Sequence, residues 1–279
     1  MSYKIVVDSC CELPEELKKD PRFESVPLTL IVGDSYEQPD DETFNQRVFL
    51  DAVAACPTCP KSACPSPERY LEAYKTQAEH VYAVTLSSQL SGSYNSAVLG
   101  KNLYHDAYGE KDIYVVDSRS ASCGETQLAY KIMEYEEAGL SFAEITEKIE
   151  QYVKEMNTYF VLENLETLRK NGRLSKVKAF VASTLNIKPL MGADNGNIVQ
   201  LGQGIGMKKA LAKLADAVVS NAKNAETKRL MITHCNNPSS AESVRRDIME
   251  RLKVKEVVIM DTAGISSMYA NDGGVIVTL

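Results

Sequence analysis

The first 157 residues alternate short β-branched segments with helical segments, and this alternation restricts the fold strongly. The strand-like segments, each bounded by polar residues, span 4–8, 25–31, 81–86 and 113–117. The helical patterns span 14–19, 41–55, 67–79, 93–104, 125–137 and 141–156. Strands that alternate with helices in this way form a mostly parallel sheet with helices on both faces. We therefore expect an α/β domain over residues 1–157.

The second half changes character near Asn157. A strand is expected at 159–161, followed by a helix whose apolar face carries Leu162, Leu165 and Leu168. Asn171-Gly172 provides the positive φ at which helices end, and Ser175 begins another helix that runs to about 185. Asp194-Asn195-Gly196 is a strong hairpin signal. Further strands are expected at 187–191, 198–199, 229–234, 256–260 and 274–279, with helices at 208–222 and 238–253. These elements predict a second α/β domain over 158–279, built on a mixed sheet.

Length and charge limit the classes of function. The 279 residues exceed the roughly 150 residues of an average domain, which supports two domains. The formal net charge is −7, and an acidic surface repels phosphate backbones, so nucleic acid is not an expected partner. No apolar run approaches the ~20 residues that a bilayer requires. The N-terminus enters a strand pattern directly without a signal-peptide cleavage site, which predicts a cytoplasmic protein.

The chain contains seven cysteines. An odd count in a chain of this kind indicates reduced thiols rather than a disulfide framework. Cys56, Cys59 and Cys64 could share a metal ion, but a fourth ligand is lacking nearby and two prolines stiffen the segment. We therefore favour ordinary loop thiols here and expect no metal and no cofactor.

Hydroxyl-rich turns are the sequence features most suggestive of a site. Known nucleotide, metalloprotease and hydrolase motifs are absent, and the three histidines are scattered. A dense serine run, 87–96, follows the strand at 81–86, where ligands of α/β sheets bind. Similar runs occur at 117–124 and 61–67. Such a turn is either an anion site or a simple helix cap. A glycine-rich loop at 202–209 is a weaker candidate for phosphate.

Several short motifs in a fixed order resemble the DegV family, which includes the bacterial fatty-acid-binding subunits of fatty acid kinase. The motifs are Val7-Asp8-Ser9, Leu13-Pro14, Val26-Pro27-Leu28, Pro65-Ser66-Pro67, the block from Ser87 to Tyr94, Val116-Asp117-Ser118, the leucines at 162, 165 and 168, Asn171-Gly172-Arg173-Leu174-Ser175 and Ile187-Lys188-Pro189-Leu190. Each motif alone is weak, but together they span nearly the whole chain.

The resemblance implies one long-chain fatty acid in a tunnel between two α/β domains. It also implies a non-catalytic protein that presents the ligand carboxylate to a separate kinase, which forms the acyl phosphate. We expect a monomer, because such a carrier has to dock to another protein. The residues that it assigns to ligand binding are Ser62, Ser87, Ser88, Ser91, Gly92, Arg173 and Tyr269. A buried carboxylate needs several donors or a cation, which these residues can supply.

The chain departs from the family pattern at two sites. Tyr269 occupies the position of a family histidine, and Gly204-Ile205-Gly206 replaces an arginine associated with kinase docking. A milder change is Ser62-Ala63-Cys64-Pro65, where Thr-Ser-Gln-Pro is common. Our hypothesis is that lipid binding is retained while the kinase partnership is altered. Two other classes stay open: a serine-dependent hydrolase or transferase of small molecules, and a regulator that binds a polar anion.

Overall fold

The computed structural model describes residues 2–174, 177 and 186–279. The helix expected from Ser175 to about 185 lies outside the described residues. The first half contains β1 (Tyr3–Asp8), α1 (Glu15–Lys18), β2 (Phe23–Val26), β3 (Thr29–Val32), β4 (Tyr36–Pro39), α2 (Gln46–Ala55), β5 (Lys61–Ala63), α3 (Pro67–Tyr74), β6 (His80–Thr85), α4 (Ser93–Tyr108), β7 (Asp112–Asp117), α5 (Cys123–Glu137) and α6 (Phe142–Glu155).

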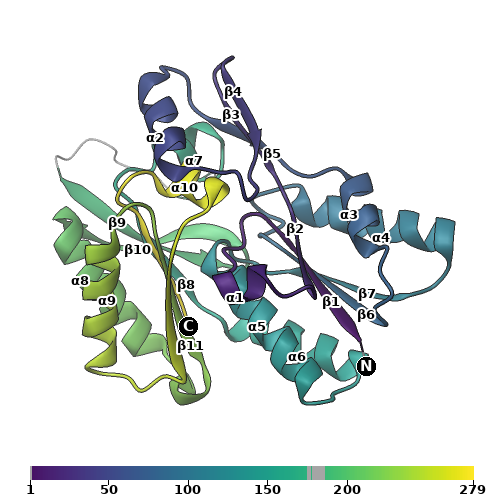
Figure 1. Ribbon diagram of the computed structural model, residues 1–279. Coiled ribbons are helices and arrows are strands. Elements are labelled where there is room, and N and C mark those ends of the chain that lie inside the picture. Colours follow the sequence, from purple (N-terminus) through teal and green to yellow (C-terminus); the bar gives the residue numbers. More distant parts are fainter. Residues whose placement is uncertain (1, 175–176, 178–185) are drawn as a thin grey trace.

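The first sheet is parallel throughout, in the order β2-β1-β6-β7. Helices α3 and α4 pack on one face, and α5 and α6 pack on the other (Figure 1). Side chains alternate across β1, because Ile5 and Val7 enter the core under α5 while Val6 enters the core under α3 and α4. The predicted parallel sheet with helices on both faces is confirmed.

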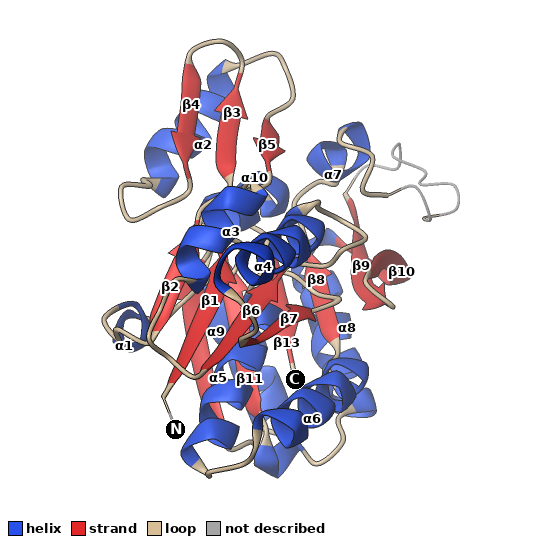
Figure 2. Ribbon diagram, turned by 90° about the vertical axis from the view of Figure 1, so that its right-hand side faces the viewer, coloured by secondary structure: helices blue, strands red, loops and turns tan. Residues whose placement is uncertain are grey.

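A small antiparallel sheet, β4-β3-β5, stands apart from the two large sheets and carries α2 at its side (Figure 2). The prediction of one strand over 25–31 was wrong, because the chain leaves the parallel sheet after Val26 and begins β3 at Thr29. Pro27 lies between them and has no N–H to donate to a sheet. Strands β4 and β5 were not foreseen, since both are short and polar.

The second half forms a six-stranded mixed sheet in the order β10-β9-β8-β13-β11-β12. Its elements are β8 (Thr158–Val161), α7 (Glu166–Lys170), β9 (Ile187–Asp194), β10 (Asn197–Ile205), α8 (Gly206–Asn221), the 3₁₀ turn Ala225–Thr227, β11 (Arg229–His234), α9 (Pro238–Met249), β12 (Glu256–Asp261), α10 (Gly264–Ala270) and β13 (Val275–Thr278). Among the described strands of this sheet, β11 and β12 pair in parallel and the other neighbours pair antiparallel. The mixed sheet is confirmed, whereas the boundary between 157 and 158 stays a prediction.

The hairpin between β9 and β10 has the predicted turn. Asn195 and Gly196 have φ values of 48° and 80°, so both central residues adopt the left-handed conformation that a two-residue hairpin favours. The prediction of a glycine-rich loop at 202–209 was wrong. Strand β10 continues to Ile205, and Gly206, with φ at 76°, turns the chain directly into α8.

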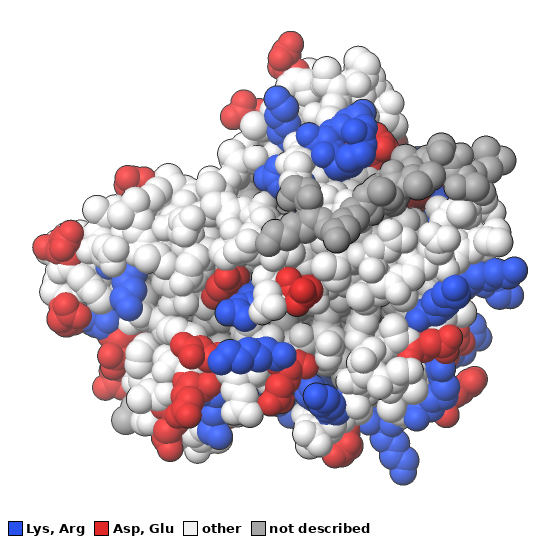
Figure 3. All heavy atoms as spheres, turned by 180° about the vertical axis from the view of Figure 1, so that it is seen from behind, with Lys and Arg blue, Asp and Glu red and all other residues white. Residues whose placement is uncertain are grey.

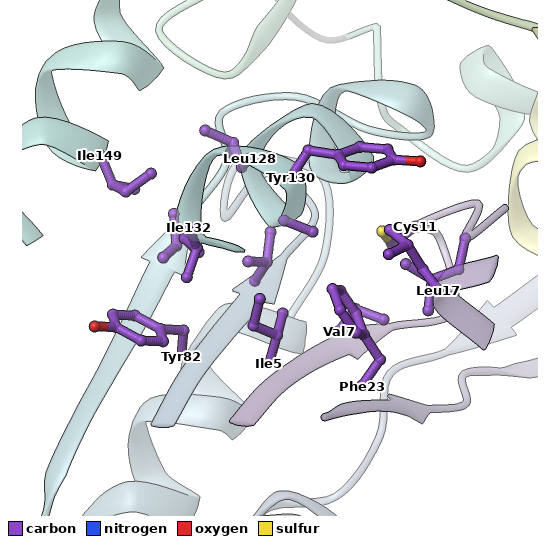
Figure 4. Close-up of a cluster of buried hydrophobic side chains, with 14 of the residues drawn as sticks. Ile5, Val7, Cys11, Leu17, Phe23, Tyr82, Leu128, Tyr130, Ile132 and Ile149 are labelled. Atoms are coloured by element: carbon purple, nitrogen blue, oxygen red, sulfur yellow. The ribbon is translucent and has the colours of Figure 1, made fainter. Parts of the chain in front are cut away.

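Helix α5 lies between the two large sheets and joins them through one apolar core. It contacts β1 and β6 on one side and β11 and β13 on the other. The core includes Ile5, Tyr82 and Leu128 from the first half (Figure 4). Met231 from β11 belongs to the same core. The neighbours of Met231 on β11 point the other way, into the core under α8 and α9. The relative position of the two sheets is therefore fixed by buried apolar contacts.

The surface carries mixed charge on the face shown in Figure 3, where acidic and basic side chains alternate along its lower part. Within the described part of the chain, no helix has the length and apolar character needed to cross a membrane.

Candidate functional site

A cavity of about 370 Å³ lies where the strand ends of the two large sheets and the small sheet meet. This volume falls within the range of about 300–1,000 Å³ typical of small-molecule sites. Its walls are mostly apolar and draw on both halves of the chain, including Leu28, Leu86, Phe160, Leu162, Ile198 and Ile265. Walls of this kind accommodate an apolar ligand.

We call one part of the cavity wall the mouth; it consists of Ser62, Cys64, Ser91, Gly92, Arg173 and Tyr269. Other polar residues in the wall are Arg119, Ser120, Ser122, Thr158, Asn197 and Ser266. The Arg173 side chain donates from Nε to the Leu90 carbonyl oxygen at 3.2 Å and also to the Asn171 carbonyl oxygen. Its guanidinium lies 5.9 Å from the centre of the Tyr269 ring. Burial raises the pKa of Tyr269, while contact with Ser62 and the charge of Arg173 oppose this rise.

The charges that line the cavity have one sign. Of the described residues in its wall, none is acidic, and Arg119 and Arg173 are cationic. Arg119 donates to the Asn195 side chain at 3.2 Å, while the bonds of Arg173 go to neutral carbonyl oxygens. An anionic group at the mouth would therefore meet an arginine that has no acidic side chain bonded to it.

The structure brings together Ser62, Ser91, Gly92, Arg173 and Tyr269 from the sequence-predicted set, all in the cavity wall. Ser87 and Ser88 do not line the cavity. The Ser87 hydroxyl donates to the Gly196 carbonyl oxygen at 2.8 Å, and the Ser88 hydroxyl donates to Asp117 Oδ2 at 2.6 Å. These two bonds hold the serine turn in place.

Asp8, at the end of β1, organises this turn and was not predicted as a site residue. Its carboxylate accepts hydrogen bonds from the Leu86 N–H at 2.9 Å, the Cys10 N–H at 3.0 Å and the Ser93 hydroxyl at 2.6 Å. The sequence signal was an acidic residue at the carboxyl end of a buried strand. Gly92 permits the close approach of the turn to β5, since a Cβ atom there would lie 3.0 Å from the Cys64 sulfur.

The histidines lie outside the cavity wall. His80 bonds Glu136 at 2.6 Å, His105 bonds the Lys111 carbonyl oxygen and His234 lies 3.2 Å from Asp261. A hydrolase that uses Ser88 would need a base beside its hydroxyl, and there the described residues place Asp117.

The three clustered cysteines have separate surroundings. The Cys56 sulfur contacts the Thr58 hydroxyl, Cys59 accepts from the Asn171 amide at 3.5 Å and Cys64 lies at the mouth. Across residues 2–174, 177 and 186–279, no three His, Cys, Asp or Glu side chains are placed to hold a metal ion.

Comparison with known proteins identifies the family. A family model described as "Uncharacterised protein, DegV family" matches residues 2–278. The chain belongs to the DegV family. A DegV domain-containing protein of Streptococcus pneumoniae is 34% identical over 280 residues, covering 99% of this chain and 98% of that protein. The resemblance inferred from the sequence motifs is therefore confirmed.

Solved structures of other DegV proteins have the same fold. A DegV family protein from Ruminococcus gnavus, described with vaccenic acid, is 53% identical with a TM-score of 0.97, covering 100% of this chain and 99% of that chain. The Streptococcus pneumoniae Fatty Acid Kinase (Fak) B3 protein, loaded with linoleic acid, is 32% identical with a TM-score of 0.88, covering 100% and 99% of the two chains. A DegV family protein from Eubacterium eligens, loaded with heptadecanoic acid, is 28% identical with a TM-score of 0.90, covering 99% of each.

Proposed function

We propose that this DegV protein binds one long-chain fatty acid, with the acyl chain in the cavity and the carboxylate at the mouth. The observation that carries the proposal is an apolar cavity with no acidic residue in its described wall and with Arg173 at its polar part. Each buried methylene contributes about 0.8 kcal/mol, so ~14 methylenes give a gross gain of about 11 kcal/mol. The fatty acids bound to the three relatives support the same ligand class.

The proposed head-group site uses Ser62, Ser91, Gly92, Arg173 and Tyr269. The hydroxyls of Ser62 and Tyr269 can each donate to a carboxylate, and Arg173 adds a charge-assisted bond. The Gly92 N–H precedes the first turn of α4 and has no partner among the described residues. These donors together would replace the water that the carboxylate loses on binding.

The finer part of the proposal concerns the partner. We infer that the chain is a monomeric, cytoplasmic and non-catalytic carrier that presents the carboxylate to a fatty acid kinase. The named role of the Streptococcus pneumoniae relative supports the kinase, and seven free thiols support a reducing compartment. Tyr269 and Gly204-Ile205-Gly206 differ from the family pattern, so a cognate kinase should form less acyl phosphate with this chain than with a relative that keeps the histidine and arginine. Equal rates would refute that altered partnership.

The ligand proposal is tested by purifying the protein under native conditions, extracting it with organic solvent and identifying the extract by mass spectrometry. A near-stoichiometric long-chain fatty acid is expected. Ala63→Trp adds a large side chain at an exposed position of the cavity wall and should reduce the bound lipid. Ala54→Trp, at an exposed position on α2 outside the wall, is the matched control and should bind normally. Repeated extracts without lipid would refute the proposal.

A further inference from the structure

A second polar region of the cavity wall lies at the β9–β10 hairpin, and we call it the hairpin end. It consists of Arg119, Ser120, Thr158 and Asn197. The Arg119 guanidinium donates to the side chain of Asn195, in the hairpin turn, at 3.2 Å. Ser120 and Thr158 share a hydrogen bond of 2.7 Å, which joins the turn after β7 to the start of β8. The cavity therefore has polar groups at the hairpin as well as at the mouth.

The hairpin end and the mouth contact different parts of the serine turn. The Ser87 hydroxyl, at the start of this turn, donates to the Gly196 carbonyl oxygen at 2.8 Å. Arg119 lies beside Gly196, since a Cβ atom on that glycine would lie 3.4 Å from the Arg119 Cα atom. Arg173 instead donates to the carbonyl oxygen of Leu90, further along the turn and just before the residues of the mouth. The two arginines of the wall thus approach the cavity at separate places.

One apolar cluster connects the two polar regions. Its members in the cavity wall include Leu90, Phe160, Leu162, Leu168, Ile198 and Tyr269. Tyr269 belongs to the mouth, whereas Ile198 directly follows Asn197 of the hairpin end. Phe160 lies two residues after Thr158, on the same face of β8. A ligand that follows this wall has an apolar middle and can carry a polar group at each end.

Arg119 forms no ion pair among the described residues, although two acids lie near it. Asp117 accepts from the Ser88 hydroxyl at 2.6 Å and from the Arg119 backbone N–H at 3.1 Å. Asp194 accepts from the Asn195 amide at 3.0 Å. The guanidinium itself bonds the neutral oxygen of Asn195. A guanidinium has five N–H donors, so Arg119 can still bind a carboxylate through two of them.

The hairpin end reaches the surface of the described structure. Arg119 and Ala193 are both part of the cavity wall, and both are exposed. A carboxylate held there keeps part of its hydration, whereas a carboxylate at a closed apolar end would lose it without replacement. A terminal methyl group gains nothing from Arg119, but a carboxylate gains a charge-assisted hydrogen bond.

We propose that the hairpin end is a second anion site, and that the cavity binds long-chain acids with a carboxylate at both ends. This inference rests on the proposed function, because it places the first carboxylate at the mouth and the chain along the apolar wall. The second carboxylate accepts hydrogen bonds from Arg119. The ligand class is therefore the straight-chain α,ω-dicarboxylic acids, which we call diacids.

The test is competition of diacids with a fluorescent fatty acid for the delipidated full chain at neutral pH. Saturated diacids from decanedioic to octadecanedioic acid are compared with the monocarboxylic acid of each length. Arg119→Met removes the charge and Arg119→Lys keeps it. Arg119 has a φ of 50°, and both replacements are unbranched at Cβ like arginine, so the backbone is not strained further. Arg246→Met, at an exposed position on α9 outside the wall, is the matched control.

At least one diacid should compete for wild type, and Arg119→Met should weaken its binding by about two- to fivefold, the range for an exposed ion pair. The loss should shrink at high salt, because the charge of Arg119 is exposed. Binding of the monocarboxylic acid should not change, and Arg119→Lys and Arg246→Met should keep diacid binding.

Two results would overturn the second anion site. One is that diacids of every length fail to compete while the monocarboxylic acids bind. The other is that Arg119→Met leaves diacid binding unchanged, or weakens both kinds of acid equally. If wild type binds neither the fluorescent fatty acid nor the monocarboxylic acids, the proposed function itself is refuted.

Discussion

Replacing Arg173 by methionine tests whether the mouth of the cavity recognises a carboxylate. The substitution keeps a long unbranched side chain and removes the positive charge. Arg173 is partly buried, and its guanidinium bonds only carbonyl oxygens among the described residues, so its charge has no acidic partner in the unliganded protein. A charged hydrogen bond of this kind contributes about 1.5–3 kcal/mol. The expected loss of affinity is roughly tenfold to 150-fold.

The assay compares a long-chain fatty acid with the alcohol of the same chain length. An interaction with the carboxylate predicts that Arg173→Met weakens binding of the acid and leaves binding of the alcohol nearly unchanged. Arg169→Met is the matched control, because Arg169 lies one turn away on α7, is exposed and pairs with Glu166. This variant should bind both ligands as wild type does.

A second effect of the substitution has to be separated from the first. Arg173 bonds the Leu90 carbonyl oxygen in the serine turn, so it also links the second half of the chain to the first. If the substitution only loosened the mouth, the protein would lose affinity for the acid and for the alcohol equally. Equal losses for the two ligands, or no loss for the acid, would refute a carboxylate held by Arg173.

Three further predictions concern the framework of the site. Ser87→Ala leaves the buried Gly196 carbonyl oxygen without its 2.8 Å donor and should lower the free energy of unfolding in urea by about 1–3 kcal/mol. Gly264→Ala places a Cβ atom 2.5 Å from Asp40 Oδ1 and against Leu30, so a similar loss of about 1–3 kcal/mol is expected by the same measurement. For Glu134, burial raises the pKa but hydrogen bonds from Lys and Arg side chains outweigh it, to about 2 from 4.5. The Glu134 carboxylate therefore stabilises the folded protein above pH 4.5, and this stabilisation is lost as the pH falls toward 2. In Glu134→Gln the melting temperature should accordingly depend less on pH between 4.5 and 2, as measured by thermal unfolding.

The sequence was most informative where the structure depends on local backbone geometry. Asn195-Gly196 predicted a two-residue hairpin because both positions require positive φ, and this requirement does not depend on distant residues. The β-branched strands of the parallel sheet were predicted for a similar reason, since burial on both faces requires continuous apolar runs. Pro27 was the missed local signal, because a residue without an N–H separates β2 from β3.

The site was less predictable because its parts come together through the packing of the two sheets. A serine run at a strand end predicts hydroxyls near a ligand, but it does not say which hydroxyls face outward. In the structure the hydroxyls of Ser87 and Ser88 donate hydrogen bonds to Gly196 and Asp117, both of which are distant in sequence. Ser91, which follows these two residues in the turn, lies in the cavity wall.

The buried carboxyl group of Glu12 shows why a residue that supports a site is harder to identify than one that touches its ligand. Glu12 lies in a short loop after β1, and nothing in its neighbouring sequence distinguishes it from a solvated acid. Its isolation is created by α5 and α10, which arrive from more than 100 residues away and bring Ser122 and the Ala263 N–H to its two oxygens. The same contacts place it one hydroxyl from the cavity. Neither contact could be inferred from the residues next to Glu12, because both depend on how distant segments of the chain pack.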